Sequence, residues 1–244
     1  MLETDSIGRK AGDEWLIQDV SITISGGERL AIVGPSGSGK TVLLRALALL
    51  DPIDAGVIRW HGQTVSGPAI PDYRSRVAYL HQRPALFEGT VEDNLRQPFS
   101  LGLHHRKRFD RERLLGMLNS LGRGAAFLNK RDQDLSGGES QLAAVLRAVQ
   151  LDPEYLLLDE PTAALDAESA SSVEQMVLQW MNEQPDQRAL VWVTHDATQP
   201  ERIGASIYRM RQGHLQGGHL QGDQLEGGQL EGLTDSGGDR CTLN

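Results

Sequence analysis

Short apolar runs recur along the chain, and their spacing predicts strands that alternate with helices. WLIQDVSITIS alternates apolar and polar positions and LAIV is continuously apolar, so residues 14–33 predict two strands joined by a turn at residues 26–28. Similar runs predict further strands at residues 76–82, 155–160, 189–196 and 206–210. This rhythm indicates a mostly parallel sheet covered on both faces, preceded by an N-terminal antiparallel part.

Helical signals fill the segments between these runs. Good helix formers extend to about Leu50, where Pro and Gly in DPIDAG stop the helix. VIRWHGQTV predicts a hairpin with its turn at His61–Gly62. Residues 84–150 have a helical character, which predicts a subdomain inserted between strands. Capping boxes are expected at Thr90 and Ser136, and helices at residues 110–122, 136–151 and 167–183.

The composition changes at Gly213, where four five-residue repeats occupy residues 213–232. A period of five fits neither an amphipathic helix nor an alternating strand. We therefore expect a folded domain over residues 1–212 and a Gly-rich, disordered tail over residues 213–244. His214 and His219 could bind a metal weakly, although histidines in such a tail more often bind nothing specific.

Composition limits the classes of function. The chain has 244 residues, 39% of them hydrophobic, and a net charge of −9, which argues against nucleic acid as a partner. Its single cysteine, Cys241, allows no internal disulfide and fits a reducing compartment such as the cytoplasm. No run approaches the roughly 20 apolar residues that span a bilayer. The protein is therefore expected to be soluble, or held at a membrane by another molecule.

GPSGSGKT, Gly34–Thr41, fits the phosphate-binding pattern G-x-x-x-x-G-K-[ST] and lies between a predicted strand and a predicted helix. Glycines allow the backbone N–H groups to approach phosphate oxygens at the start of a helix. Lys40 would reach the β- and γ-phosphates and Thr41 would ligate Mg²⁺. The expected nucleotide contacts in this loop are Gly34, Pro35, Ser36, Gly37, Ser38, Gly39, Lys40 and Thr41.

Two further stretches add chemistry to this loop. YLLLDE carries Asp159 and Glu160 to the end of a buried strand, where Asp159 would hold Mg²⁺ and Glu160 would act as general base. LSGGE has the S-x-x-E pattern of a helix start, but two glycines in a first turn cost stability unless a phosphate approaches the backbone. Either stretch alone has an ordinary structural explanation, a polar turn or a helix cap.

Taken together, these residues resemble the ATP-binding-cassette (ABC) ATPases, specifically the nucleotide-binding subunits of transporters, over about residues 15–210. GPSGSGKT matches the Walker A motif, YLLLDE the Walker B motif and LSGGE the signature motif, in family order. Gln82 matches the Q-loop glutamine, AALD, which ends at Asp166, matches the D-loop, and His195 matches the switch histidine. The resemblance implies an α/β P-loop NTPase core of ABC type with an inserted helical subdomain.

The same resemblance implies an ATPase that uses ATP and Mg²⁺ as a homodimer. Ser136, Gly137 and Gly138 of one subunit would then face the ATP on the P-loop of the other, and Asp166 would touch the partner's site. Gln82 would sense the γ-phosphate and the metal, and His195 would orient the water. Because the chain contains no permease segment, the membrane subunit would be a separate polypeptide, with this subunit on the cytoplasmic face of the inner membrane.

Three positions depart from the family pattern. The aromatic residue that stacks on adenine aligns near Ala11, so that contact is missing or comes from another residue such as Trp15. Glu139 replaces the usual Gln, and Leu142 stands where Arg is common. Within the family the chain is most similar to small bacterial ATPases of the iron-efflux type, but the substrate depends on the permease.

Two other functions would require different sequence features. A soluble ABC ATPase acting in DNA maintenance or translation generally needs a long coiled-coil insertion or two cassettes, and this chain has one cassette without long heptads. A P-loop kinase would need neither LSGGE nor His195.

Overall fold

A mainly parallel sheet of six strands forms the centre of the computed structural model, which describes residues 1–83, 85–104 and 107–217. The strand order is β10-β9-β3-β8-β7-β6, and β10 is the antiparallel strand at one edge. Strands β7 and β8 are buried throughout, as expected for the middle of a sheet covered on both faces. The bounds are β3 (Arg29–Val33), β6 (Val77–Leu80), β7 (Tyr155–Asp159), β8 (Ala189–Val193), β9 (Ser206–Arg211) and β10 (His214–Gly217).

A second, antiparallel sheet is built from the N-terminal part of the chain in the order β2-β1-β4-β5. The predicted hairpin is confirmed, because His61 and Gly62 form a two-residue turn in which both have positive φ, 49° and 76°. The sequence pattern did not predict β1. Bulges interrupt its pairing with β2, and its central residues are mostly polar. The strands are β1 (Leu2–Ala11), β2 (Glu14–Ile24), β4 (Ala55–Trp60) and β5 (Gln63–Thr64).

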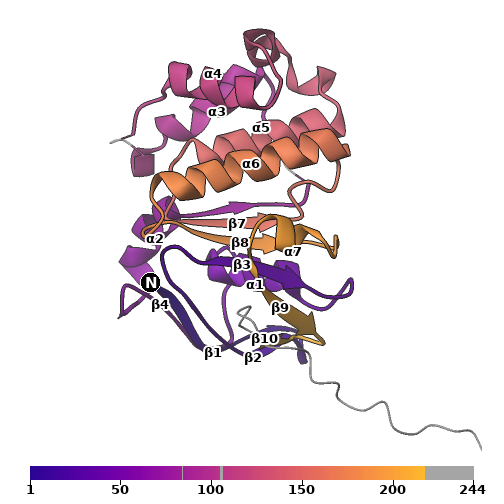
Figure 1. The fold of residues 1–244 in the computed structure, drawn as a ribbon. Helices are drawn as coiled ribbons and strands as arrows, with labels where there is room; N and C mark the ends of the chain where they lie inside the picture. Colours follow the sequence, from indigo (N-terminus) through magenta and orange to yellow (C-terminus); the bar gives the residue numbers. More distant parts are fainter. Residues whose placement is uncertain (84, 105–106, 218–244) are drawn as a thin grey trace, which may run out of the picture.

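Helices cover both faces of the parallel sheet, and Figure 1 shows them as layers. Helix α1 (Lys40–Leu47) lies between the two sheets, where Leu43, Leu44 and Leu47 are completely buried in one apolar core. Helices α5 (Gly137–Val149) and α6 (Ala167–Glu183) cover the opposite face and enclose a second core. The sheet therefore separates two apolar cores, one on each of its faces.

Between β6 and β7 the described chain is helical, and it includes the predicted amphipathic helix. That helix, α4 (Arg111–Ser120), begins after the N-cap Asp110 and buries Leu114 and Leu118. Thr90 forms the predicted capping box with Asp93 at the start of α3 (Val91–Arg96). Two further short α-helices are α2 (Ile70–Arg76) before β6 and α7 (Gln199–Arg202) after β8, and the remaining described helices are short 3-10 turns.

The predicted start of the tail needs correction. Residues 214–217 are not disordered but form β10, which pairs with the edge strand β9. Gln212 and Gly213 make the two-residue turn of this hairpin, with positive φ values of 47° and 81°. Pairing with β10 satisfies backbone groups that an edge strand would otherwise expose. The fold therefore extends through Gly217, and the remaining repeats, with His219, lie outside the described residues.

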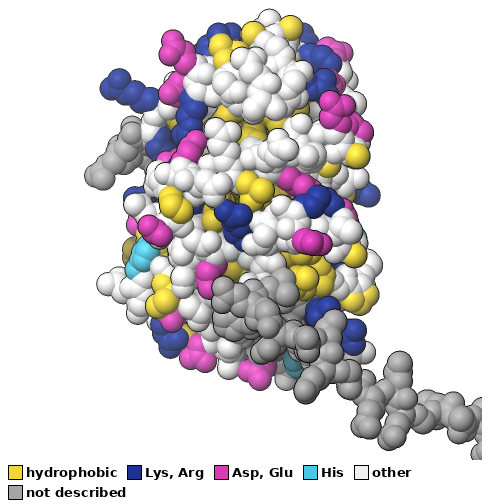
Figure 2. All heavy atoms as spheres, in the orientation of Figure 1, with side chains coloured by type: hydrophobic (Ala, Val, Ile, Leu, Met, Phe, Trp, Pro, Cys, Tyr) yellow, Lys and Arg dark blue, Asp and Glu magenta, His cyan; other side chains and the backbone are white. Residues whose placement is uncertain are grey.

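No helix in the described ranges is long and apolar enough to cross a membrane. Figure 2 shows acidic and basic side chains interspersed over one face of the molecule, without a continuous basic surface.

Candidate functional site

Four neighbouring parallel strands deliver most of the predicted site residues to one edge of the sheet. Strand β3 runs into the P-loop, β8 leads to His195, β7 ends at Asp159 and Glu160, and β6 leads to Gln82. The order β3-β8-β7-β6 places these four segments beside one another. The carboxyl ends of parallel strands share one edge, so the fold itself assembles residues that are far apart in sequence.

The P-loop wraps closely over the second strand. Gly39 has φ 103°, a backbone conformation that is strained for any residue with a side chain. A Cβ at this position would also lie only 2.8 Å from the Leu16 carbonyl oxygen, so the site has no space for one. Ser38 is buried, and its hydroxyl has no hydrogen-bond partner in the described structure. Such a hydroxyl, next to the first N–H groups of α1, suits an anionic ligand.

Lys40 points back into its own loop. Its Nζ donates hydrogen bonds to the carbonyl oxygens of Gly34 at 2.8 Å and Pro35 at 2.9 Å. Burial lowers the pKa of this ammonium group, and the charges of Glu160 and Asp159 oppose the shift. The ammonium group can exchange its two carbonyl acceptors for phosphate oxygens.

Thr41 and Asp159 provide adjacent oxygen donors. The Thr41 hydroxyl donates to Asp159 Oδ2 at 2.7 Å, and the Tyr79 hydroxyl donates to the same oxygen at 3.2 Å. Burial, followed by the nearby Asp159 charge, raises the pKa of Tyr79, so this hydroxyl remains a donor. A hydroxyl and a carboxylate are the hard oxygen ligands that Mg²⁺ prefers, so these residues fit the metal that the sequence predicts. Tyr79 was not predicted, since its position in a buried strand indicates packing alone.

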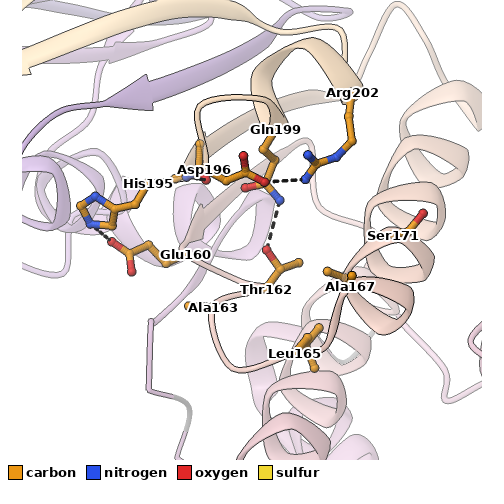
Figure 3. Close-up of a pocket in the computed structure, with 12 residues that line it drawn as sticks. Glu160, Thr162, Ala163, Leu165, Ala167, Ser171, His195, Asp196, Gln199 and Arg202 are labelled. Atoms are coloured by element: carbon orange, nitrogen blue, oxygen red, sulfur yellow. Dashed lines mark hydrogen bonds and ion pairs between the residues drawn. The ribbon is translucent and has the colours of Figure 1, made fainter.

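Glu160 lies between two other predicted residues. Its Oε2 accepts a hydrogen bond from Gln82 Nε2 at 2.6 Å, and its Oε1 lies 2.5 Å from His195 Nε2 (Figure 3). The Glu160 backbone has φ 49°, an unusual value for a residue with a side chain. Strained backbone of this kind often marks a functional position, and here it follows directly after the end of β7.

A cleft of about 580 Å³ joins the P-loop to Glu160 and His195. Trp15 lines it, and the Lys10 ammonium lies 4.4 Å from the centre of the Trp15 ring. This is the aromatic residue that the sequence offered in place of Ala11. Gln212 and Gly213 also line the cleft, although they were assigned to the boundary of the tail. Backbone bonds explain their place, because Gly213 N–H donates to the Ser38 carbonyl at 3.1 Å.

The signature residues lie elsewhere. Ser136 caps α5 and forms the predicted capping box with Glu139, whose pKa is lowered chiefly by Lys130. Ser136, Gly137 and Gly138 do not line the P-loop cleft within the described chain. Asp166 caps α6, and hydrogen bonds from Ser169 lower its pKa. One chain therefore assembles the P-loop, Walker B, Q-loop and switch-histidine residues but not the signature residues.

The comparisons with known proteins agree with this geometry. The sequence profile of the ABC transporter family matches residues 17–163, more than half of the chain. The chain is 35% identical over 196 residues to the "Probable iron export ATP-binding protein FetA" of Escherichia coli, which covers 80% of this chain and 85% of that protein. It is 34% identical to "Fe(3+) ions import ATP-binding protein FbpC 1" of Rhodococcus jostii, but spans only 60% of that relative.

Solved structures show the same fold. A dimeric post-hydrolysis state of the ATP-binding cassette MJ0796, bound to ADP and Pi, has a TM-score of 0.77 and 26% identity, and covers 91% of this chain and 100% of that chain. A bacterial Atm1-family ABC exporter with ATP bound has a TM-score of 0.73 and 25% identity, and covers 90% of this chain and 38% of that chain. The P-loop, the paired carboxylates and these matches agree, and the chain belongs to the ABC transporter family as an ATP-hydrolysing, ATP-binding subunit.

Proposed function

We propose that this ATPase binds Mg-ATP in the P-loop cleft and uses Glu160 as the general base that activates water. The observation that carries the proposal is the position of Glu160, whose two carboxylate oxygens are held separately by Gln82 and His195. A base must lie within hydrogen-bond reach of the proton that it removes, and these contacts hold the carboxylate in the lining of the cleft.

The other site residues have matching roles in the proposal. Thr41 and Asp159 would hold Mg²⁺, with Gln82 near it, and a bound Mg²⁺ would supply positive charge against the phosphate oxygens. Lys40 moves from its loop carbonyls to the β- and γ-phosphates. His195 contacts the γ-phosphate and helps Glu160 to orient the water. The P-loop backbone N–H groups and the Ser38 hydroxyl complete the anion cradle.

A second copy of the chain completes the site. Ser136, Gly137 and Gly138 form a helix start that does not line this chain's own P-loop cleft, and its N–H groups remain suited to a γ-phosphate. We propose that each subunit presents this helix start to the ATP on its partner, with Asp166 near the partner's site. The dimeric state of the similar cassette MJ0796 supports this arrangement.

The partner that we propose in the membrane is a separate permease, which places this subunit on the cytoplasmic face. A cavity of about 260 Å³ lies between the P-loop core and the helical segment, lined by Arg74, His104, Arg147 and uncharged residues. Burial lowers the pKa of Arg147, whose guanidinium donates to the Ala85 carbonyl, and Leu50 at the rim is 44% exposed. An apolar permease segment that carries a carboxylate fits this surface, since it would pair with the arginines and cover the leucine.

Removal of the Arg147 charge tests the docking surface. Arg147→Gln should weaken co-purification of a permease encoded beside this subunit and leave the ATPase rate of the isolated subunit unchanged. Arg211→Gln, at an exposed position on β9, is the matched control and should retain the permease. Equal retention of the permease by both variants would count against this surface.

For the transported substrate we propose a metal ion, with iron efflux as the specific candidate, because a similar protein is described as an iron export subunit. The complex with its permease should be placed in vesicles with the cassettes facing outward. ATP-dependent uptake of Fe²⁺ into these vesicles, absent with Glu160→Gln, is the expected result. ATP hydrolysis without movement of Fe²⁺ would remove the iron assignment and leave the ATPase mechanism intact. A soluble role in DNA maintenance or translation is less well supported, since the similar proteins above are transporter subunits.

A further inference from the structure

Gln199 is a buried amide with all its hydrogen-bonding groups in use. It is 2% exposed at the start of α7. Its Oε1 accepts from Trp192 Nε1 at 3.0 Å, and its Nε2 donates to Glu174 Oε1 at 2.7 Å and to Thr162 Oγ1 at 3.1 Å. The indole N–H only donates and an ionised carboxylate only accepts, so this amide has one orientation that satisfies both.

The three partners of Gln199 belong to three different segments, each of which carries or adjoins a proposed site residue. Trp192 lies in β8, which leads to His195. Thr162 lies in the turn that follows Glu160. Glu174 lies in α6, the helix that Asp166 caps. A single buried side chain therefore ties together the supports of the base, the switch histidine and the D-loop.

Arg202 strengthens this connection from the other end of α7. Its guanidinium pairs with both oxygens of Glu174, at 3.0 Å and 2.8 Å, and donates to Asp196 Oδ2 at 2.9 Å. Asp196 directly follows His195, and its backbone N–H donates to the Thr194 hydroxyl at 3.0 Å. His195 thus projects from a loop fixed on both sides, although its own side chain is half exposed.

A cavity of about 570 Å³ is lined by the turn after Glu160, the first part of α6 and the segment after His195 (Figure 3). Besides the bonds of Gln199 and Arg202 to Glu174 on α6, two polar side-chain contacts in the described structure join the segment that contains Glu160 to the segment that contains His195. The His195–Glu160 pair does so at the proposed catalytic end, and the Gln199–Thr162 hydrogen bond does so farther along the chain. Without the second contact, only the bonds of Gln199 and Arg202 to Glu174 on α6 would join the two segments through polar side chains at that end.

We propose that Gln199 is a positioning residue that sets the distance between His195 and Glu160 during ATP hydrolysis. It acts through its hydrogen bond to Thr162, and Glu174, which also pairs with Arg202, holds it in place. This inference rests on the proposed roles of His195 and Glu160. Gln199 itself touches neither nucleotide nor water in the reaction. Gln199, Thr162, Glu174 and Arg202 form one hydrogen-bonded cluster. Loss of Gln199 should slow the chemical step and leave ATP binding intact, because the P-loop and the Thr41–Asp159 pair are not part of this cluster.

The Thr162 hydroxyl allows a test that does not disturb the buried core, because this residue is only half buried. Thr162→Val keeps the shape and removes the hydrogen-bond acceptor, whereas Thr162→Ser keeps the acceptor. We expect Thr162→Val to lower kcat about 5–10-fold, the factor that corresponds to one net hydrogen bond, with KM for ATP changed less than about twofold. Thr162→Ser should restore kcat to near the wild-type value.

A double-mutant cycle separates positioning from a general structural effect. If the cluster acts through His195, Thr162→Val should have no further effect on single-turnover hydrolysis in a His195→Ala background, and Gln199→Met should behave in the same way. Additive losses, an equal loss in Thr162→Ser, or a wild-type kcat in Thr162→Val would overturn the inference. Glu160→Gln in the same assay distinguishes a failure of the proposed catalytic mechanism from a failure of the positioning role of Gln199. A wild-type rate there removes the proposed mechanism, whereas an inactive Glu160→Gln beside a fully active Thr162→Val removes only the role of the cluster.

Discussion

The Thr41 hydroxyl donates a 2.7 Å hydrogen bond to Asp159 Oδ2, although 118 residues separate the two in sequence. Thr41 lies in the first turn of α1 and Asp159 is the last residue of β7. The bond therefore joins the phosphate-binding helix to the strand that carries the carboxylates. The two residues that would hold the metal are therefore already brought together by the fold.

Removal of the Thr41 hydroxyl should impair use of Mg²⁺. Thr41→Val keeps the branched shape but removes one proposed ligand, so the Mg²⁺ concentration for half-maximal ATPase activity should rise at least about tenfold. Thr41→Ser keeps the hydroxyl and should remain near wild type. The measurement is a titration of ATPase activity with Mg²⁺ at constant ATP. An unchanged midpoint in Thr41→Val would show that this hydroxyl is not a metal ligand.

Replacement of Lys40 should abolish tight nucleotide binding. The ammonium group that now donates to two loop carbonyls is the cation that the P-loop pattern assigns to the phosphates, and charge-assisted hydrogen bonds are stronger than neutral ones. In Lys40→Ala, ATP affinity should fall at least about tenfold, which corresponds to the loss of one such bond, and turnover should be lost. Fluorescent nucleotide titration measures the affinity. The control Arg113→Ala removes a positive charge on α4 and should bind ATP normally. Near-normal turnover in Lys40→Ala would contradict the P-loop assignment.

The β9–β10 hairpin should stabilise the fold. A chain cut after Gly217 keeps β10, whereas a chain cut after Gln212 also loses the bonds that Gly213 makes with Gln18 and Ser38. Several net hydrogen bonds of about 1 kcal/mol each should be lost, so thermal unfolding should occur several degrees lower in the shorter chain. ATP binding should weaken as well, because Gly213 lines the cleft. Identical melting temperatures for the two truncated chains would show that β10 contributes nothing to stability.

The local features of this molecule could be predicted from the sequence. The P-loop, the two capping boxes and the hairpin turn at His61 depend on residues a few positions apart, and the structure contains each of them. The convergence of Gln82, Glu160 and His195 followed from strand ends on a parallel sheet, together with the family resemblance. These predictions needed no knowledge of side-chain packing.

The missed features depend on distant partners or on a misleading composition. Gln199 is a polar residue before a proline, and nothing local indicates that it is buried against Trp192 and Glu174. The start of the repeats was assigned to a tail because they are rich in Gly, yet Gln212–Gly213 carries a two-residue hairpin signal. The Gln212–Gly213 turn signal, unlike the Gly-rich composition, indicates the hairpin that contains β10.

Stability should depend on Asp196 in acid. Hydrogen bonds, first from the Thr198 backbone and then from Arg202, lower the pKa of this carboxyl to about 2. Because the folded value lies below the unfolded value of about 3.9, the carboxylate stabilises the fold fully above pH ~4 and progressively less as the pH falls toward 2. Asp196→Asn should thus be less stable than wild type at pH 7, and the difference should narrow below pH ~4. Urea unfolding over this pH range measures it, with the exposed Asp13→Asn as control. A difference of the same size at pH 7 and pH 2.5 would assign the effect to packing.

The roles of Glu160 and Ser136 can be tested through one intermediate, the ATP-bound dimer. Glu160→Gln keeps the size of the side chain but cannot accept the proton, so hydrolysis should fall by about 10²–10⁴-fold. Lys40, Thr41 and Asp159 remain, so ATP binding should survive and the closed dimer should persist. Light scattering should then detect a dimer with ATP and a monomer with ADP.

Addition of Ser136→Arg tests whether the dimer closes over the nucleotide. Ser136 is the N-cap of α5, where an arginine would place bulk and remove the hydroxyl that accepts from Glu139 N–H. If this helix start contacts the partner's γ-phosphate, the double variant should remain monomeric with ATP and still bind nucleotide. Asp110→Arg, which removes the N-cap of α4 in the same way, is the matched control and should leave the dimer intact. A double variant that still dimerises with ATP would reduce LSGGE to a helix cap, whereas a Glu160→Gln protein that hydrolyses ATP at the wild-type rate would falsify the assignment of the base.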